Sequence, residues 1–217
     1  MPRTVVAARR QIIDAPSFVP LPRLIERPRV EFFDILDARR SGTGADLPVE
    51  HLSSLLWHSM CLRERGPGRF GLGRESRSAP SAGGLHPIRL LVLPVNGKGA
   101  GIYDDHRHAL IPLEGAALEL NRDSVSEILG IAAGTTIQFA ADAALVDACY
   151  ENASSLIWRD AGALVATMCL VAAALGLAAT PVGRVGNAIV QAACLPGDFV
   201  GAGAVHFGTL SNEGAAG

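Results

Sequence analysis

Apolar residues recur with a helical period in two segments near the start of the chain. Between residues 30 and 40 the apolar side chains fall on one helical face, and the Ser-Gly-Thr-Gly sequence that follows ends the predicted helix. Pro48 opens a second predicted helix, VEHLSSLLWHSM, whose leucines form its inner face. The folded part of the chain is therefore expected to begin with two helices.

Apolar runs and turn residues later in the chain predict strands mixed with helices. We expect a strand at Ile88–Leu93, a hairpin made of GIYDD and HALIPL, and further strands at TTIQFAADAAL, AATPV and VGAGAVHFGTL. Helices are expected at residues 121–132 and 186–194. Because the order lacks a regular strand–helix–strand rhythm, the pattern favours an α+β fold, with a mixed central β-sheet flanked by helices, over a Rossmann fold.

The longest predicted helix runs from about Ser154 to Leu175 and overlaps a stretch, Ala161 to Gly183, that has no charged residue. On length alone this stretch can span a bilayer. Gly176 and Pro181 interrupt it, and it is built largely of alanine. We therefore expect a helix buried between other helices and no membrane span.

Two other segments have little predicted regular structure. Residues 1–29 are interrupted by prolines and form a predicted extended arm, with a dimer partner as one candidate surface for it to cover. Residues 63–77, RERGPGRFGLGRESR, are rich in glycine and arginine, and we expect this loop to become ordered when something binds. Residues 30–217 are then expected to form a single domain.

Composition narrows the class of protein. Hydrophobic residues make up 49% and charged residues 18% of the chain, which predicts a folded core. A formal net charge of -2 argues against nucleic acid or an anionic membrane surface as the partner. The cysteines lack Cys-x-x-Cys spacing and the chain shows no secretory signal, so reduced thiols in a cytoplasm are expected.

The first candidate site is Arg39-Arg40-Ser41, at the C-terminal end of the first predicted helix. Arginines at such a position can simply interact with the helix dipole. Alternatively, the two guanidiniums and the hydroxyl form a phosphate clamp, because a guanidinium offers a fork of donors that matches phosphate oxygens.

The second and third candidates are turns with small side chains. In RSAPSAGGLHP, residues 77–87, backbone amides can approach a flat ring or a polyol closely and Ser81 adds a hydroxyl, although an ordinary glycine-rich connection has the same composition. His86 in this segment is interpreted as structural. Residues 180–187, TPVGRVGN, join a strand to a helix and direct backbone N–H groups toward a ligand.

These three segments, in this order, resemble those of the nitroreductase superfamily. LDARRSGTG looks like the family's N-terminal Arg-Arg-Ser flavin segment, and RSAPSAGGLHP is similar to the Pro-Ser-Ala-Gly segment of SagB-type (thiazole/oxazole-forming) peptide dehydrogenases. SLIWRDAGALVATMCLVAAALGLAATPVGRVG looks like their long central helix and the Pro-x-Gly turn after it. The resemblance covers about residues 30–210.

The resemblance implies a nitroreductase-like fold and a homodimer that holds FMN at the subunit interface, with the long buried helix as the dimer core. Carried over by position, the phosphate end of FMN would be bound by Arg39, Arg40 and Ser41. One subunit would line the isoalloxazine and ribityl with Pro80, Ser81, Ala82 and Gly83. The pyrimidine side of the ring and N5 would be approached by Val182, Gly183 and Arg184.

The chain departs from the family pattern at two places. Many relatives have a basic residue after the final strand that grips the phosphate, and this chain ends FGTLSNEGAAG without one. Azole-forming relatives often have a Lys-Tyr pair before the long helix, and the corresponding pair here is Cys149-Tyr150. Arg39, Arg40 or an arginine of the glycine-rich loop would then carry more of the phosphate binding.

A dehydrogenation needs a base that removes a proton as the hydride leaves for flavin N5. Tyr150 is the nearest candidate, and Arg159 is the candidate cation that would help a phenol to ionise. In the alternative interpretation Tyr150 is a buried anchor, and Arg159 and Asp160 form an ion pair at the start of the long helix.

Three functions remain open on the sequence. The first is an FMN-dependent dehydrogenase of a peptide or peptide-derived natural-product intermediate. The second is an NAD(P)H-dependent nitro or quinone reductase, and the third is a degenerate nitroreductase-like subunit that binds a partner without chemistry of its own. A metal enzyme is disfavoured, because His106-x-His108 has only the loop residues Asp104 and Asp105 nearby.

Overall fold

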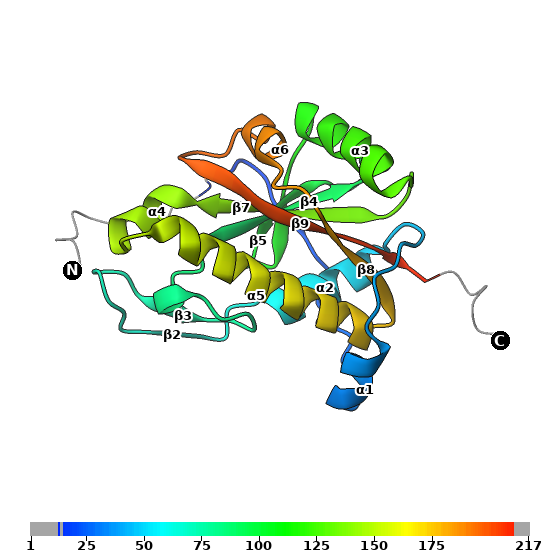
Figure 1. Cartoon of the computed structure of the whole chain (residues 1–217), viewed down its shortest axis with the longest axis horizontal. Helices are drawn as coiled ribbons and strands as arrows, with labels where there is room; N and C mark the ends of the chain where they lie inside the picture. The colour runs from blue at the N-terminus through cyan, green and yellow to red at the C-terminus, as the bar shows by residue number, and fades with distance from the viewer. Residues whose placement is uncertain (1–12, 14, 211–217) are drawn as a thin grey trace.

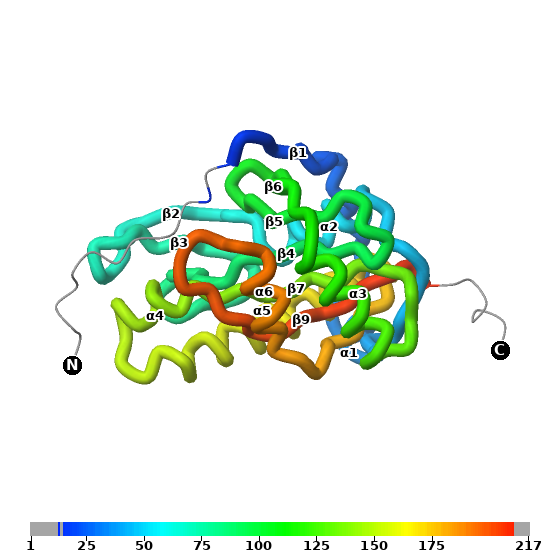
Figure 2. The backbone as a smooth tube through the Cα atoms, turned by 90° about the horizontal axis from the view of Figure 1, so that it is seen from above, coloured from blue at the N-terminus to red at the C-terminus, as the bar shows by residue number. Residues whose placement is uncertain are grey.

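The computed structural model describes Ile13 and residues 15–210 of the chain. Its centre is a seven-stranded sheet with the spatial order β1-β6-β5-β4-β7-β9-β8, and Figure 2 shows this succession from β1 to β9. The strands are β1 (Val19–Pro20), β4 (Ile88–Pro94), β5 (Gly101–Asp104), β6 (Ala109–Pro112), β7 (Thr135–Asp142), β8 (Leu177–Val182) and β9 (Phe199–Thr209). Neighbouring strands pair antiparallel, and a parallel contact is made by the isolated bridge between Ser41 and Ala179.

Helices cover both faces of this sheet (Figure 1). One face carries α2 (Val49–Met60) and α5 (Ala153–Ala174), and the other carries α3 (Ala116–Leu129) and α6 (Asn187–Ala192). The remaining elements are α1 (Phe32–Ala38), α4 (Ala143–Cys149), the short 3-10 helix η1 (Ala82–Gly84), and the two-stranded sheet of β2 (Glu64–Gly66) and β3 (Arg74–Ser76). The expected α+β class, a central sheet flanked by helices, is confirmed.

Strand alternation explains why the sheet can bury both of its faces. On β4, Leu90 and Val92 pack with α2 and α5, whereas Leu91 and Leu93 pack with the α3 and α6 side. Every residue of β7 is buried. The continuous apolar runs that predicted strands 88–93 and 135–145 are therefore the signature of strands covered on both faces.

Helix α5 is long and apolar enough to cross a membrane by length and composition alone. In the fold it lies across the sheet, where Ile157, Leu164 and Met168 belong to the main core. Its opposite face is exposed at Trp158, Gly162 and Ala166. The helix therefore has the burial pattern of a core helix with one uncovered side.

Several predicted boundaries differ from the structure. The strand predicted to reach residue 145 ends at Asp142, because the carboxylate of Asp142 caps α4 by accepting a hydrogen bond of 3.0 Å from the backbone N–H of Leu145. Helix α3 begins at Ala116 rather than residue 121, directly after Gly115. The loop at residues 63–77 contains the short hairpin of β2 and β3.

The arm predicted at residues 1–29 lies partly outside the described residues, which exclude 1–12 and 14. Its later part joins the sheet, since β1 pairs with β6. Leu21 then enters the main core. After β1 the arm runs along α2, where the Ser53 hydroxyl donates to the carbonyl of Pro22 and the Glu26 N–H donates to the Ser54 hydroxyl.

Candidate functional site

The Arg39-Arg40-Ser41 segment runs beside β8, the edge strand of the sheet. Ser41 forms a parallel bridge with Ala179. The N–H of Gly42 donates to the carbonyl of Ala179 at 3.3 Å, and the Thr180 hydroxyl donates to the carbonyl of Gly42 at 2.9 Å. The first and third candidate segments, far apart in the chain, therefore meet at one edge of the sheet.

The two arginines bring positive charge to this edge. Nη1 of Arg40 donates to the carbonyls of Asp37 at 2.6 Å and Arg39 at 2.8 Å, at the C-terminal end of α1. Arg39 is half-buried, and its guanidinium opposes the rise that burial causes in the pKa of the Cys169 thiol on α5. The guanidinium of Arg40 is thus held at the C-terminal end of α1, whereas that of Arg39 lies close enough to α5 to act on Cys169.

The turn after β8 offers open backbone. Gly183 is exposed, a Cβ added there would meet no atom within 4 Å, and its N–H donates to none of the residues that the structure describes. A strand rise of ~3.3 Å per residue puts Gly183 about 13 Å from Ala179 along the edge. The edge between the arginines and this turn therefore has the length of an extended phosphorylated chain with a ring at its end.

Arg184 does not extend over this open side. Its Nη2 donates to Oδ1 of Asn121 on α3 at 2.6 Å, and its Nε donates to Oε1 of Gln138 on β7 at 3.4 Å. Burial lowers the pKa of Arg184 to about 10, so the side chain stays cationic at neutral pH. The prediction named Val182, Gly183 and Arg184 as residues that approach the ring. In the structure the backbone of this turn is open at the edge, whereas the guanidinium of Arg184 is directed toward α3 and β7.

Gln138 supports the same turn and was not singled out in the sequence. Its fully buried amide donates to the carbonyls of Val185 and Gly203, each at 2.8 Å. A Cβ on Gly186 would lie 2.2 Å from Oε1 of Gln138. The strand register shifts between Gln138 and Ala140, as β-bulges near functional sites often do. The sequence signal that could have identified Gln138 is its polar side chain between the apolar residues Ile137 and Phe139 of β7.

The second candidate segment is held by Asp160 on α5. The Ser81 hydroxyl donates to Asp160 at 2.5 Å, the Ala82 N–H donates to the same carboxylate at 3.1 Å, and the His86 N–H donates to the Ser81 hydroxyl at 2.9 Å. Burial raises the pKa of Asp160, and the Ser81 and Ala82 hydrogen bonds oppose that rise. The carboxylate therefore fixes the Pro80–Gly83 turn to the helix.

Tyr150 lies against this turn. A Cβ on Gly83 would stand 2.4 Å from the Tyr150 hydroxyl oxygen, which explains a glycine at that position. The ring of Phe70, from the glycine-rich loop, meets the Tyr150 ring edge-on at 5.1 Å between centroids. Burial raises the pKa of Tyr150, Cys149 and Asp160 raise it further, and Arg69 lowers it.

Arg159 is not the cation beside Tyr150 within one chain. Its Nε and Nη2 donate to the carbonyl and hydroxyl of Ser155 at 3.3 and 3.2 Å. Arg69 is the arginine that acts on the pKa of Tyr150. The structure therefore brings Tyr150 together with Gly83 and leaves Arg159 on the exposed surface of α5.

The candidate residues form two groups at different positions along α5. Asp160 holds the Pro80–Gly83 turn near the start of the helix, whereas Arg39 acts on Cys169 farther along. Nine residues at ~1.5 Å each separate these positions by about 13 Å. In one chain the two groups therefore do not close around one small ligand.

Comparisons with known proteins agree with the architecture. The model of the Nitroreductase family matches residues 43–209. A Ralstonia eutropha JMP134 protein assigned as a nitroreductase has 21% identity and a TM-score of 0.66, over 97% of this chain and 95% of that chain. None of the curated proteins compared with the chain matches it.

Two further solved structures share the fold. One is the E. coli microcin synthetase McbBCD complex with truncated pro-MccB17 bound, with a TM-score of 0.61 and 15% identity over 93% of this chain and 79% of that chain. The other is a Desulfovibrio desulfuricans protein, assigned as a nitroreductase and in complex with FMN, with a TM-score of 0.55 and 18% identity over 87% of this chain and 91% of that chain.

Proposed function

The chain belongs to the nitroreductase family and is an FMN-dependent oxidoreductase, and we propose that it dehydrogenates a peptide or peptide-derived natural-product intermediate. The observation that carries the proposal is the meeting of the Arg39–Ser41 segment with the edge of β8. A likeness in fold to a synthetase bound to a peptide precursor supports the substrate class.

The residues at the β8 edge fit FMN. The guanidiniums of Arg39 and Arg40 and the Ser41 hydroxyl suit a phosphate. Gly183 offers a backbone N–H that donates to no described residue and room for a flat ring, at a distance that a ribityl phosphate and its ring span together. When bound, the flavin supplies the hydride chemistry at N5, and the protein supplies position, charge and exclusion of water.

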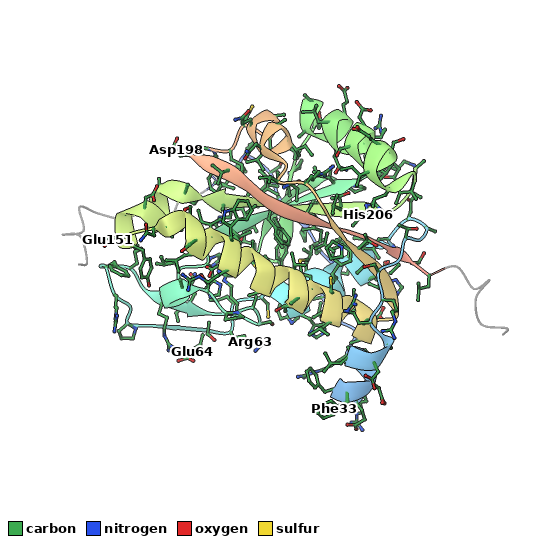
Figure 3. All side chains as sticks on the ribbon, viewed as in Figure 1. Phe33, Arg63, Glu64, Glu151, Asp198 and His206 are labelled. Atoms are coloured by element: carbon green, nitrogen blue, oxygen red, sulfur yellow. The ribbon has the colours of Figure 1, made fainter. Side chains whose placement is uncertain are left out.

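A second copy of the chain completes the site in this proposal. Helix α1 has no buried residue, and its apolar side chains Phe32 and Phe33 are 57% and 75% exposed. Figure 3 shows Phe33 directed away from the rest of the molecule. Together with the uncovered face of α5 at Trp158 and Gly162, this surface has the apolar character of a homodimer interface. Pro80–Gly83 of one protomer would then line the FMN held by Arg39–Ser41 and Val182–Arg184 of its partner.

The proposal places the enzyme in the cytoplasm. Cys61, Cys149, Cys169 and Cys194 are free thiols, as a reducing compartment requires. The apolar helix that suggested a membrane span contributes to the core of the sheet.

Tyr150 is the proposed proton acceptor in dehydrogenation. Its raised pKa keeps most of the phenol neutral at pH 7, so the rate of flavin reduction by substrate should rise with pH. Tyr150→Phe is expected to lower that rate by about 10²–10⁴ and to remove the rise. Phe70→Leu, which changes only the ring packed against Tyr150, should keep the pH dependence. A Tyr150→Phe profile parallel to that of the unmodified protein would contradict this role.

One observation favours a second function, NAD(P)H-dependent reduction of a nitro compound or quinone. The raised pKa keeps the phenol of Tyr150 in its protonated form at pH 7, which is the form needed in a reaction where the acceptor gains both hydride and proton. Anaerobic absorption spectra separate the two functions. Bleaching of the flavin band by NADPH supports the reductase, and bleaching only by peptide supports the dehydrogenase.

The same spectra test the shared premise. The purified protein should be yellow and release FMN on denaturation. Arg40→Ala should lose FMN while keeping its oligomeric state. A colourless protein that cannot be reconstituted with FMN would overturn both functions.

A further inference from the structure

Two adjoining cavities lie between the N-terminal arm, α2 and the C-terminal half of α5. Their volumes are about 310 and 400 Å³, and both are lined by Arg27, His58 and Arg63. Figure 3 labels Arg63 beside α5, just before β2. We propose that these cavities form one site that anchors the oxyanion of an organic ligand.

The lining of both cavities is basic. Neither includes a carboxylate, in a chain whose formal net charge is -2. The acids next to Arg27 and Arg63 in the sequence have other partners, because Glu26 pairs with His51 at 3.3 Å and Glu64 pairs with Arg74 at 3.9 Å. Positive charge is thus concentrated where nothing in the lining neutralises it.

The guanidinium of Arg63 is held in place with donors to spare. Its Nη2 donates to the Ser78 hydroxyl at 2.9 Å, and that hydroxyl donates in turn to the carbonyl of His58. A guanidinium has five N–H donors, and the remaining ones of Arg63 donate to no other described residue. The side chain of Arg27 forms no hydrogen bond or ion pair with any residue in the described part of the chain. Two forked donors are therefore free to bind one carboxylate or phosphate.

The walls select an organic anion over a bare ion. Trp57 lines one cavity, with its ring fixed edge-on against His108 at 5.0 Å between centroids. Val171 and Leu175 of α5 line the other. An apolar body can pack against these side chains while its charged end meets the arginines.

The position of the site relates it to the proposed reaction. Ser78, which fixes Arg63, stands two residues before Pro80 and the turn that holds Tyr150. A ligand anchored by its anionic end would extend toward that turn. The choice of ligand rests on the proposed function: a peptide carboxylate for dehydrogenation, or a nucleotide phosphate for reduction by NADPH.

Isothermal titration calorimetry of the FMN-loaded protein tests the site. The probes are adenosine 2′,5′-bisphosphate, a hydrophobic tripeptide with a free C-terminal carboxylate, and the same tripeptide as its amide. Arg27→Gln/Arg63→Gln is compared with Arg29→Gln/Arg122→Gln, which removes the same charge from exposed positions outside the cavities.

One anionic probe is expected to bind and the amide is not. The cavity double variant should raise the Kd of that probe about tenfold or more, and the control should leave it unchanged. Binding of the bisphosphate identifies a nucleotide site, and binding of the free tripeptide identifies a peptide site. Failure of both anions to bind, or an equal loss in the control, would overturn the proposal.

The FMN content of each variant separates this test from the proposed function. Both double variants should keep their flavin, because the proposed function assigns the FMN phosphate to Arg39–Ser41 and not to Arg63 of the glycine-rich loop. If the purified protein holds no FMN, the proposed function fails, and the same titrations on that protein still decide whether the cavities bind an anion.

Discussion

The side-chain amide of Gln138 joins three parts of the backbone at the turn that presents Gly183. It donates to Val185 in the turn and to Gly203 on β9, while its oxygen accepts from Arg184. The Val185 carbonyl also accepts from the backbone N–H of Gly203 at 3.1 Å, so the amide of Gln138 reinforces a backbone hydrogen bond between the turn and β9. The position of the Gly183 N–H therefore depends on a residue that does not face the edge itself.

Gln138→Leu should weaken FMN binding without a change at the edge of β8. The turn and β9 lose two side-chain hydrogen bonds, so we expect the free energy of unfolding to fall by about 1–3 kcal/mol and the Kd for FMN to rise. Thr136→Val is the matched control, because this buried residue of the same strand bonds His206 and not the turn. Its unfolding free energy should fall by about 1 kcal/mol with an unchanged Kd for FMN, measured by flavin fluorescence. Equal Kd values for the two variants would contradict a positioning role for Gln138.

At the residue scale, the sequence predicts which residues belong to the candidate segments better than it predicts where their side chains point. Arg39–Ser41, Pro80–Gly83 and Gly183 could be singled out from local composition. The direction of Arg184 could not, because its partners Asn121 and Gln138 are distant in the chain. The same holds for Asp160, which binds Ser81 across 79 positions. In the alternative interpretation it pairs with Arg159, and the charge of Arg159 does lower the pKa of Asp160.

Helix α1 is an element whose burial is incomplete in one chain. Its apolar residues predicted a helix with a buried face, and a helix does form at Phe32–Ala38. None of its residues is buried, so tertiary packing within the chain does not explain its stability. We infer that, in the proposed homodimer, the partner protomer packs against the exposed apolar side chains of α1.

Phe33→Ser should therefore weaken the proposed dimer. Burial of one phenylalanine contributes about 1.5–3 kcal/mol, which predicts at least a tenfold increase in the dimer Kd. Leu120→Ser is the control, because this side chain is 40% exposed on α3, on the other face of the sheet. Sedimentation velocity over a dilution series measures both. A Phe33→Ser protein that dissociates no more than the control would exclude α1 from the interface.

Element boundaries were predictable where the pattern was local and strong. The helix at 49–60 matches α2, and the long helix predicted at 154–175 matches α5 within one residue at each end. Helix α4 was missed because its apolar sequence continues that of β7, and the signal of a helix start is the single N-cap Asp142. The hairpin of β2 and β3 was missed because its strands are short and polar.

At the scale of the whole molecule, two buried histidines make the stability of the fold depend on pH. His206 lies between the Thr136 hydroxyl and the carbonyl of Ala133, each at 3.0 Å, and His108 lies between Ser53 at 2.7 Å and Tyr103 at 2.8 Å. Burial lowers the pKa of both histidines, and Arg184 lowers that of His206 further. In the native state both rings are therefore neutral at pH values where an unfolded histidine, with a pKa of about 6.5, becomes protonated.

The sign of the resulting pH dependence follows from proton binding. Below about pH 6.5 the unfolded chain binds more protons at these two positions than the native state does, so the free energy of unfolding should fall as the pH is lowered from 7 toward 5.5. The raised pKa of Asp160 acts in the opposite direction, but only near the pH range where carboxylates titrate.

Urea denaturation at a fixed protein concentration should show a lower midpoint at pH 5.5 than at pH 7. His206→Gln should reduce that difference, whatever its effect on stability at pH 7, because one of the histidines with a lowered pKa is gone, while His108 and the surface residue His106 remain. A midpoint that does not change between these pH values, or a difference that His206→Gln leaves intact, would mean that the buried rings take up protons in the native state.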